Sequence, residues 1–587
     1  MRSPDRRFVL TYNGEIYGAE ALRSELSARG IVFRGRCDTE VLLAAIARWG
    51  VEAALERVDG MFAFAVWDAE RRRLTLARDR MGKKPLYYAS LGGRFLFASE
   101  LKALHAHPLF RASVDPNAVA ELIRHSYVSA PHTIYTDVSK LAAGTLLHVP
   151  IRDGPRPASP RRWWDLRQVF EEGAQDQLDL PPAAAAEVLE SLLRDAVAQR
   201  MSADVPVGAL LSGGVDSATV VALMQGAASR PVRTFTVGYE EADMDESAAA
   251  RRVAERLGTE HRTLMATPDM ALELIPRLPA LYDEPFADTS QLPSALISRL
   301  AREHVTVALS GDGGDELFLG YDRYFRCRER WRAMAWLALP ARRRLARGLR
   351  GLDPVRFERA AHALAATDVE DLFRRTNDRC ADVNALVPGA DPDQGRTVRA
   401  PAFLRDPLSR MAWQDLAGRL PESILVKVDR ASMGFGLEVR SPLLDARVVR
   451  LCARLPHSLK ARRGERKWLL RRVLERHVPP GVSAGPKRGF GVPIGRWLRG
   501  PLRDWAESLL SPRRLREGGL FDAEGVRAIW AQHLSGQRDR RFLLWNLLSF
   551  QAWQLATERS VGLGDALPSL RLEVGSADQG HGSGGSQ

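Results

Sequence analysis

The sequence predicts a protein of at least two domains: an α+β layer comes first, and a parallel α/β domain with a helical C-terminal part follows. Three observations lead to this fold class. A chain of 587 residues is too long for one hydrophobic core. Short apolar strands alternate with turns over residues 8–105, whereas helices alternate with buried strands from residue 183 onward. The second pattern is the one that builds a parallel sheet.

The expected elements follow in order from these patterns. In the first layer we expect strands over 8–12, 62–67, 74–77 and 95–98 and a helix over 20–29. In the second domain we expect helices over 183–200 and 248–257 and after Ser217, and strands over 207–211, 232–237 and 305–309. Beyond residue 325 the amphipathic pattern predicts mainly helix.

Composition marks the domain boundaries. We expect the first domain over residues 1–150. A Pro- and Arg-rich stretch, followed by an acidic segment, predicts a linker over 151–182. The second domain then covers 183–558, and the Gly- and Ser-rich residues 559–587 are expected to form a disordered tail.

Charge, cysteine content and hydropathy exclude several classes of protein. The net charge of +13 comes mostly from scattered arginines, without the aromatic-interleaved basic stripe of a nucleic-acid surface. The densest cluster, Arg342 to Arg350, has helical spacing and predicts the solvated face of a helix. Four widely spaced cysteines favour free thiols over disulfides or zinc. With no signal peptide or membrane span in the sequence, we expect a cytoplasmic protein.

Two glycine-rich loops carry the chemistry. The run from Ser212 to Ser217, S-G-G-V-D-S, lies between a buried strand and a helix, where free amides and the helix dipole bind phosphate. A second run from Ser310 to Glu316, S-G-D-G-G-D-E, follows another buried strand. Loops at the carboxyl ends of neighbouring parallel strands converge on one crevice, so the pair predicts a nucleotide and metal site. Asp216 is placed to hold Mg²⁺, which prefers carboxylate and phosphate oxygens.

These loops and other segments resemble one family. Residues 212–217 resemble the pyrophosphatase loop of N-type ATP pyrophosphatases, and 310–321 are similar to a signature of asparagine synthetases. Segments that resemble the same family are 13–17, 38–42, 60–65, 77–80, 84–88, 98–102, 427–430, 437–440, 442–445 and 487–490. The chain is therefore identified as an N-terminally truncated member of the glutamine-hydrolysing asparagine synthetase family over residues 8–555.

The resemblance implies a fold, a reaction and a set of residues. It implies an Ntn-type glutaminase layer followed by an N-type ATP pyrophosphatase domain. ATP would adenylate a carboxylate, the side chain of aspartate in the parent activity, and ammonia would then displace AMP. The implied ATP-binding residues are Leu211, Ser212, Gly213, Gly214, Asp216, Ser217, Val237, Ser310 and Gly311. Asp216 and Asp315 are implied as Mg²⁺ ligands, and Asp312 and Lys487 as catalytic residues.

The glutaminase end departs from the family pattern. Family members expose an N-terminal cysteine whose α-amine activates its own thiol, but no cysteine precedes Cys37 here. Cys37 cannot replace this nucleophile, because it has no free α-amine and no nearby His in the sequence, and it is interpreted as a small buried residue. The resemblance still implies an oxyanion hole formed by Asn13 and the amide of Gly14, and glutamine contacts from Glu15 and Asp38.

Two explanations of the missing cysteine remain. Either the start was assigned too late, so that the protein begins upstream with cysteine, or the chain is a variant that uses free ammonia. The first is preferred, because the motifs at Asn13 and Asp38 keep the residue types that glutamine chemistry requires. A chain without its first strands would also expose a sheet edge.

Several functions remain open at this stage. The leading hypothesis is asparagine synthesis from aspartate, ATP and glutamine or ammonia. A relative with the same chemistry would use another carboxylate, as β-lactam synthetases and amidotransferases of secondary metabolism or exopolysaccharide clusters do. A tRNA-modifying ATP pyrophosphatase and a non-catalytic scaffold are the alternatives from other classes. The expected partners are small-molecule substrates, without nucleic acid or membrane, and a homodimer is left open.

Overall fold

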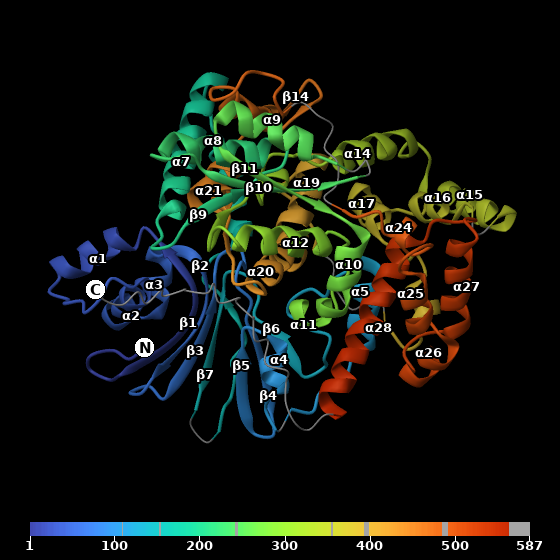
Figure 1. Cartoon of the computed structure of the whole chain (residues 1–587), viewed down its shortest axis with the longest axis horizontal. Coiled ribbons are helices and arrows are strands. Elements are labelled where there is room, and N and C mark those ends of the chain that lie inside the picture. The colour runs from blue at the N-terminus through green and yellow to red at the C-terminus, as the bar shows by residue number, and fades with distance from the viewer. Residues whose placement is uncertain are drawn as a thin grey trace, which may run out of the picture.

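Two sheets of different kinds organise the two domains of the chain (Figure 1). The computed structural model describes residues 1–108, 110–151, 154–240, 245–353, 356–391, 398–483 and 491–562. Both layers of the predicted fold class are confirmed: the first is antiparallel and the second is parallel. Among the described residues, no helix combines the length and apolar character that crossing a membrane requires.

The first domain is built on an antiparallel sheet of order β1-β2-β3-β7-β8. Its strands are β1 (Phe8–Tyr17), β2 (Asp59–Asp68), β3 (Arg73–Arg78), β7 (Thr145–Pro150) and β8 (Arg161–Arg162). Along β2 the side chains alternate, because successive residues of a strand point to opposite faces. Phe62 and Phe64 pack in one core with helices α2 (Asp38–Trp49) and α3 (Val51–Arg57).

The other face of this sheet covers a second, smaller sheet. Ala63 and Ala65 of β2 lie in the same core as Tyr88 and Phe95. The second sheet has the order β5-β4-β6, with β5 (Arg94–Ala98), β4 (Tyr87–Leu91) and β6 (Val138–Lys140). Of the strands predicted in this layer, β2 and β3 lie inside the larger sheet, whereas β1 and β5 are edge strands.

Ordered elements lie between the two domains. Within residues 151–182, predicted to be a linker, β8 pairs with β7, and α6 (Leu166–Gln175) packs on α21 (Ala446–Arg454). The contact is close, because a Cβ added at Gly173 would lie 2.6 Å from the carbonyl carbon of Ala453. This segment therefore takes part in the packing of the second domain.

The second domain contains a parallel sheet of order β11-β10-β9-β12-β13. Its strands are β9 (Val207–Leu210), β10 (Arg233–Tyr239), β11 (Glu260–Ala266), β12 (Val307–Leu309) and β13 (Glu438–Arg440). The predicted strands correspond to β9, β10 and β12. The order reverses at β9, which has β10 on one side and β12 on the other. Such a reversal leaves a crevice at the carboxyl ends of the two strands.

Helices cover both faces of the parallel sheet. Val307 and Leu309 of β12 share a core with α7 (Pro182–Met201) and α8 (Val215–Ala227). Ala308 points the other way, into the core that contains α12 (Gln291–Arg302). Near this second face, the π-helical segment η2 (Asp415–Ile424) continues into α20 (Leu425–Met433), which packs against α12.

The C-terminal part is helical, as predicted. Its outer helices α24 (Ile494–Trp497), α25 (Arg503–Leu509), α26 (Pro512–Gly518), α27 (Ala523–Leu534) and α28 (Arg541–Gly562) gather at one side of the molecule (Figure 1). The arginine cluster lies on α15 (Leu339–Leu352), which confirms the helix. The solvated-face prediction is wrong for Arg342, which is buried and donates to the carbonyl of Ala366 at 2.7 Å.

Ion pairs join the two domains through α20 and β13. Lys84 Nζ donates to Asp429 Oδ1 at 2.8 Å, and both side chains are buried. Next to this pair, Arg430 contacts Glu100 at 2.8 Å. The sequence motifs that contain Asp429 and Arg430 therefore have a structural use, because they hold the first domain against the second.

Removal of one partner of the Lys84–Asp429 pair tests this interface. We expect Lys84→Met to lower the free energy of unfolding by about 3 kcal/mol, since it leaves a buried carboxylate unpaired. In scanning calorimetry the thermal midpoint should fall by several degrees. The double variant Lys84→Met/Asp429→Leu, which removes both charges, should recover most of the loss. A midpoint equal to that of the unchanged protein for Lys84→Met alone would contradict the assignment.

Candidate active site

The first glycine loop closes on itself before α8 begins. The backbone N–H of Ser212 donates to Ser217 Oγ at 3.0 Å, and the two hydroxyl oxygens lie 2.8 Å apart. The N–H of Gly214 donates to Ser212 Oγ at 3.2 Å. The loop is therefore fixed at the amino end of α8, where backbone amides and the helix dipole favour a bound anion.

The second glycine loop packs directly against the first. A Cβ added at Gly311 would lie 2.7 Å from the nitrogen of Ser217. A Cβ at Gly314 would lie 2.4 Å from the side-chain carbon Cγ of Asp216. Only hydrogen atoms fit at these two positions, so the glycines bring the backbones of the loops into contact. The predicted convergence of the two loops is what the structure shows.

Asp216 and Asp315 meet around one ammonium group. Lys467 Nζ lies 2.5 Å from Asp216 Oδ2 and 2.6 Å from Asp315 Oδ1. All three side chains are largely buried, with exposed fractions of 8% for Lys467, 14% for Asp216 and 10% for Asp315. Burial by itself would lower the pKa of Lys467, but Asp216 and then Asp315 outweigh it and raise the pKa above its usual value.

The position of Lys467 is unusual and was not predicted. It follows the hairpin of β14 (Ala461–Arg462) and β15 (Glu465–Arg466) and precedes α23 (Trp468–Leu474). Its φ of 52° is in the left-handed region, a strained backbone for a residue with a side chain. Gly320 provides the space, because a Cβ there would lie 2.0 Å from Lys467 Cε. In the sequence, only its position just before a helix distinguishes Lys467 from the other basic residues of the chain, so its role could not be predicted.

A cavity of about 610 Å³ opens over these loops. Its walls include most of the predicted nucleotide and catalytic residues: Leu211, Ser212, Asp216, Ser217, Val237, Ser310, Gly311, Asp312 and Asp315. Gly213 lies behind the loop, where its Cβ position is 2.3 Å from Ala249 Cβ. Lys487 lies outside the described residues, so its predicted catalytic role stays a prediction.

A second lysine, Lys427, lines the cavity from α20. Its Nζ donates to Ser290 Oγ at 2.6 Å and lies 3.4 Å from Asp288 Oδ2. Burial opposes ionisation of Asp288, but Lys427 and then Arg419 outweigh it and hold the pKa of the carboxyl below its usual value. The sequence motif contained Lys427, but nothing in the motif showed that its side chain enters the cavity.

Acidic groups line the wall that the second loop forms. Ser310 Oγ donates to Asp312 Oδ2 at 2.7 Å, which orients that carboxylate at the cavity. Farther along, Tyr321 donates its hydroxyl proton to Glu316 Oε1 at 2.8 Å. Burial, and then the charge of Asp315, raise the pKa of Glu316 to about 7.

The residues predicted to bind glutamine lie in the first domain, on β1 and at the start of α2. Asn13 donates to Ser99 Oγ at 3.1 Å, and Glu15 pairs with Arg440 at 3.4 Å. Asp38 lies at the start of α2, where its Oδ2 accepts the amide N–H of Ile16 at 2.9 Å. Glu15 thus contacts the second domain, whereas Asn13 and Asp38 bind partners within the first domain.

The other glutaminase-like positions show how β1 is built. Gly14 has φ of 156°, and a Cβ there would lie 2.1 Å from the carbonyl oxygen of Met61. Burial raises the pKa of Glu15 to about 7, although Arg440 acts in the opposite direction. The interpretation of Cys37 as buried is wrong: it is exposed at the N-cap of α2, and its Sγ lies 3.6 Å from Asp38 Oδ1.

Comparison with protein families decides what this arrangement belongs to. The profile of the asparagine synthase family matches residues 188–555, and that of the glutamine amidotransferase domain matches residues 1–164. The chain belongs to the asparagine synthase family. It is an ATP-dependent carbon–nitrogen ligase of that family, which favours this class over the tRNA-modifying ATP pyrophosphatases.

Relatives in the asparagine synthase family are similar over nearly the whole chain. A protein of Mycobacterium tuberculosis H37Rv, named "Putative asparagine synthetase (glutamine-hydrolyzing)", is 36% identical over 95% of this chain and 86% of its own length. Asparagine synthetase (glutamine-hydrolyzing) 1 of Bacillus subtilis 168 is 29% identical over 94% and 85%. Amidase chyE of Penicillium rubens is 29% identical over 54% of this chain and 48% of its own length.

The close approach of the two loops can be tested with glycine substitutions. Gly311→Ala places a methyl group against Ser217 and Asp216, so the loops must separate. We expect affinity for a non-hydrolysable ATP analogue, measured by titration calorimetry, to fall at least about 10-fold, or ~1.4 kcal/mol.

The matched control for Gly311→Ala is Gly226→Ala. Gly226 lies near the end of α8 with nothing within 4 Å of the added methyl, so nucleotide affinity should not change. In a helix this change should stabilise the protein by about 0.5–1 kcal/mol. Equal affinities for the Gly311→Ala and Gly226→Ala proteins would show that the loops do not need this contact.

Proposed function

We propose that this chain synthesises asparagine from aspartate. The side-chain carboxylate of aspartate attacks the α-phosphorus of ATP, pyrophosphate leaves, and a β-aspartyl adenylate forms. Ammonia then attacks the acyl carbon, the bond to the AMP oxygen breaks, and the nitrogen loses a proton. The observation that carries the proposal is that two phosphate-type loops converge on one cavity, where Asp216 and Asp315 line the wall and Lys467 pairs with both.

The first loop supports a role in holding pyrophosphate. Its serine hydroxyls and the amides at the start of α8 face the cavity that Ser212, Asp216 and Ser217 line. Val237 and Leu211 add apolar surface suited to an adenosine. In this arrangement the triphosphate lies along the loop, with its α-phosphorus near the second loop.

Asp216 and Asp315 are the residues that would hold magnesium. Their carboxylates already surround one cationic centre, and two carboxylates with substrate phosphate oxygens suit this hard cation. Among the described residues no group of three or more His, Cys, Asp or Glu forms a metal site, so the nucleotide would have to supply further ligands. When bound, magnesium neutralises phosphate charge.

Lys467 stabilises the negative charge that develops on the phosphate during adenylation. Its ammonium is buried and held by two carboxylates, and its raised pKa keeps it protonated at neutral pH. A fixed cation near the transferred phosphorus stabilises the transition state more than the ground state, because negative charge increases there. Asp312, on the second loop, lies where it can face the acyl group or the incoming amine.

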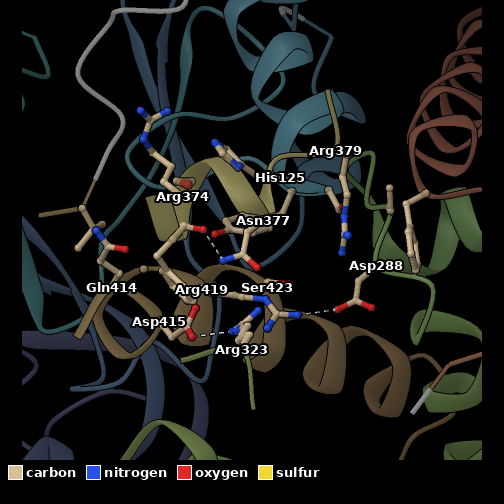
Figure 2. A pocket seen from close by; sticks show the side chains of 18 of the residues that line it. His125, Asp288, Arg323, Arg374, Asn377, Arg379, Gln414, Asp415, Arg419 and Ser423 are labelled. Carbon is tan, nitrogen blue, oxygen red and sulfur yellow. Dashed lines mark hydrogen bonds and ion pairs between the residues drawn. The ribbon is translucent and has the colours of Figure 1, made fainter. Parts of the chain in front are cut away.

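A second candidate, ligation of another carboxylate, is favoured by a pocket next to the cavity (Figure 2). The two spaces share Asp288, Thr289, Arg419 and Phe542. Figure 2 shows Arg323 paired with Asp415, and Arg379 directed at the space beside Asp288. The pocket would admit an acceptor longer than aspartate that carries an anionic group.

The nitrogen source is proposed from the first domain. Asn13, Gly14, Glu15 and Asp38 are proposed to bind glutamine, as the family resemblance implies, and free ammonia is the other donor. Separate assays of this chain with glutamine and with ammonium distinguish the two donors. Release of glutamate with glutamine alone would identify a working glutaminase site.

Exchange of pyrophosphate into ATP tests the acceptor. We expect exchange that depends on aspartate, and weaker exchange with glutamate, malonate and longer dicarboxylates. Strong exchange with a longer acid, and none with aspartate, would replace asparagine synthesis by the second candidate. The absence of exchange with every acid would contradict the ligase chemistry itself.

Lys467→Met tests the role of the buried cation. We expect it to lower the exchange rate at least about 100-fold, in the range that removal of one electrostatic group from a transition state costs. The matched control is Lys460→Met on α22 (His457–Lys460), because Lys460 is also buried but packs over the ring of Phe170, whereas Lys467 contacts two carboxylates that line the cavity. Equal rates for the two variants would remove Lys467 from the mechanism.

A further inference from the structure

A loop of the first domain enters the second domain behind the ligase cavity. It joins β3 to β4 and carries two consecutive lysines, Lys83 and Lys84. Lys84 forms the buried pair with Asp429. Lys83 takes a different direction, and 5% of its surface is exposed. This loop is therefore a place where one domain supplies charge to the interior of the other.

The loop is held rigidly by its own neighbours. Asp79 accepts the backbone N–H groups of Phe62, Met81, Lys83 and Lys84 at 2.9–3.2 Å. Arg78 donates to the carbonyls of Gly82 and Lys84, both at 2.8 Å. Since both the amide N–H groups and the carbonyl groups of the loop are hydrogen-bonded, the backbone from which the Lys83 side chain extends is fixed.

The Lys83 ammonium lies directly behind the second glycine loop. Its Nζ donates to Ser441 Oγ at 3.0 Å and is 3.9 Å from Asp312 Oδ2. Ser441 Oγ in turn lies 3.2 Å from Ser310 Oγ, which donates to the same Asp312 oxygen. Ser310 and Asp312 line the cavity, while Lys83 and Ser441 lie behind them.

We propose that Lys83 is a positioning residue of the ligase site: its ammonium, supplied by the glutaminase-type domain, holds the Asp312 carboxylate in the direction that the reaction needs. Lys83 acts directly on Asp312 Oδ2 and, through Ser441, on Ser310. This inference rests on the proposed function, because it assigns a second-domain reaction to Asp312.

A purely structural role accounts poorly for a lysine at this position. Burial lowers the pKa of Lys83, although Asp312 acts in the opposite direction, so keeping the ammonium charged here costs stability. Asp312 itself keeps an exposed fraction of 19% and a hydrogen bond from Ser310, so loss of Lys83 leaves no fully buried unpaired charge. Stability that is given up at one residue is typical of sites that serve function.

The experiment is Lys83→Met in the full chain, assayed by aspartate-dependent pyrophosphate exchange. We expect kcat to fall about 10- to 50-fold, since a misplaced reacting group is costly, while KM for ATP stays within about twofold. The thermal midpoint should be unchanged or higher. Ser441→Ala removes only the hydroxyl that connects Lys83 to Ser310. It should also lower kcat, but by a smaller factor.

A matched control and a double variant separate positioning from packing. Lys102 also crosses the interface, with Nζ 3.2 Å from the carbonyl oxygen of Ala280, but it is half exposed and pairs with Glu100 of its own domain. Lys102→Met should keep kcat within about twofold. In an Asp312→Asn protein, the added Lys83→Met should cause no further loss, because both changes act on one carboxylate.

The outcomes distinguish the two levels of the proposal. If the unchanged protein shows no exchange with aspartate, the proposed function fails, and the acid identified in the acceptor panel replaces aspartate in this test. If exchange is present but Lys83→Met matches Lys102→Met, Lys83 is no positioning residue. Additive losses in the Asp312→Asn background, or a lowered midpoint in proportion to the lost rate, would likewise overturn the inference.

Discussion

The backbone contact between the two glycine loops is the constraint on which the site depends. Gly311 lies against Ser217, and Gly314 lies against Asp216, at distances that exclude any side chain. The strand order makes this contact possible, because β9 and β12 are neighbours at the point where the order of the strands in the parallel sheet reverses. Two acidic loops that approach so closely need a counter-charge, and Lys467 supplies it from a distant part of the chain.

Helix α20 ties this site to the first domain. Within one short segment, Lys427 enters the cavity wall, Asp429 pairs with Lys84, and Arg430 donates to the carbonyl oxygen of Ser99 at 2.6 Å. Ser99 also accepts a hydrogen bond from Asn13 through its hydroxyl. Hydrogen bonds thus connect Asn13 through Ser99 to Arg430, which lies three residues along α20 from Lys427 at the nucleotide cavity. The domains form one packed unit whose sites share structural support.

Much of the architecture could be predicted because its signals are local. A short apolar run along 62–67, and a buried run along 207–211 between helical segments, identified strands. The sequence analysis missed β11 and β13 for different reasons. β11 carries polar, partly exposed residues, and β13 is too short to show a pattern, since it spans only Glu438–Arg440. Cys37 was misjudged because burial depends on what packs over a residue, which a short segment does not reveal.

The sequence by itself determined the two glycine loops, their acids and the alternating strands, because glycine conformations and side-chain periods are properties of short windows. Tertiary structure alone decided which cations complete the site. Lys83 and Ser441 are 358 positions apart, and Lys467 and Asp216 are 251 apart, so no local pattern encodes their contact. Basic residues are abundant in this chain, and only the folded packing, which buries a few of them beside carboxylates, separates those from the solvated majority.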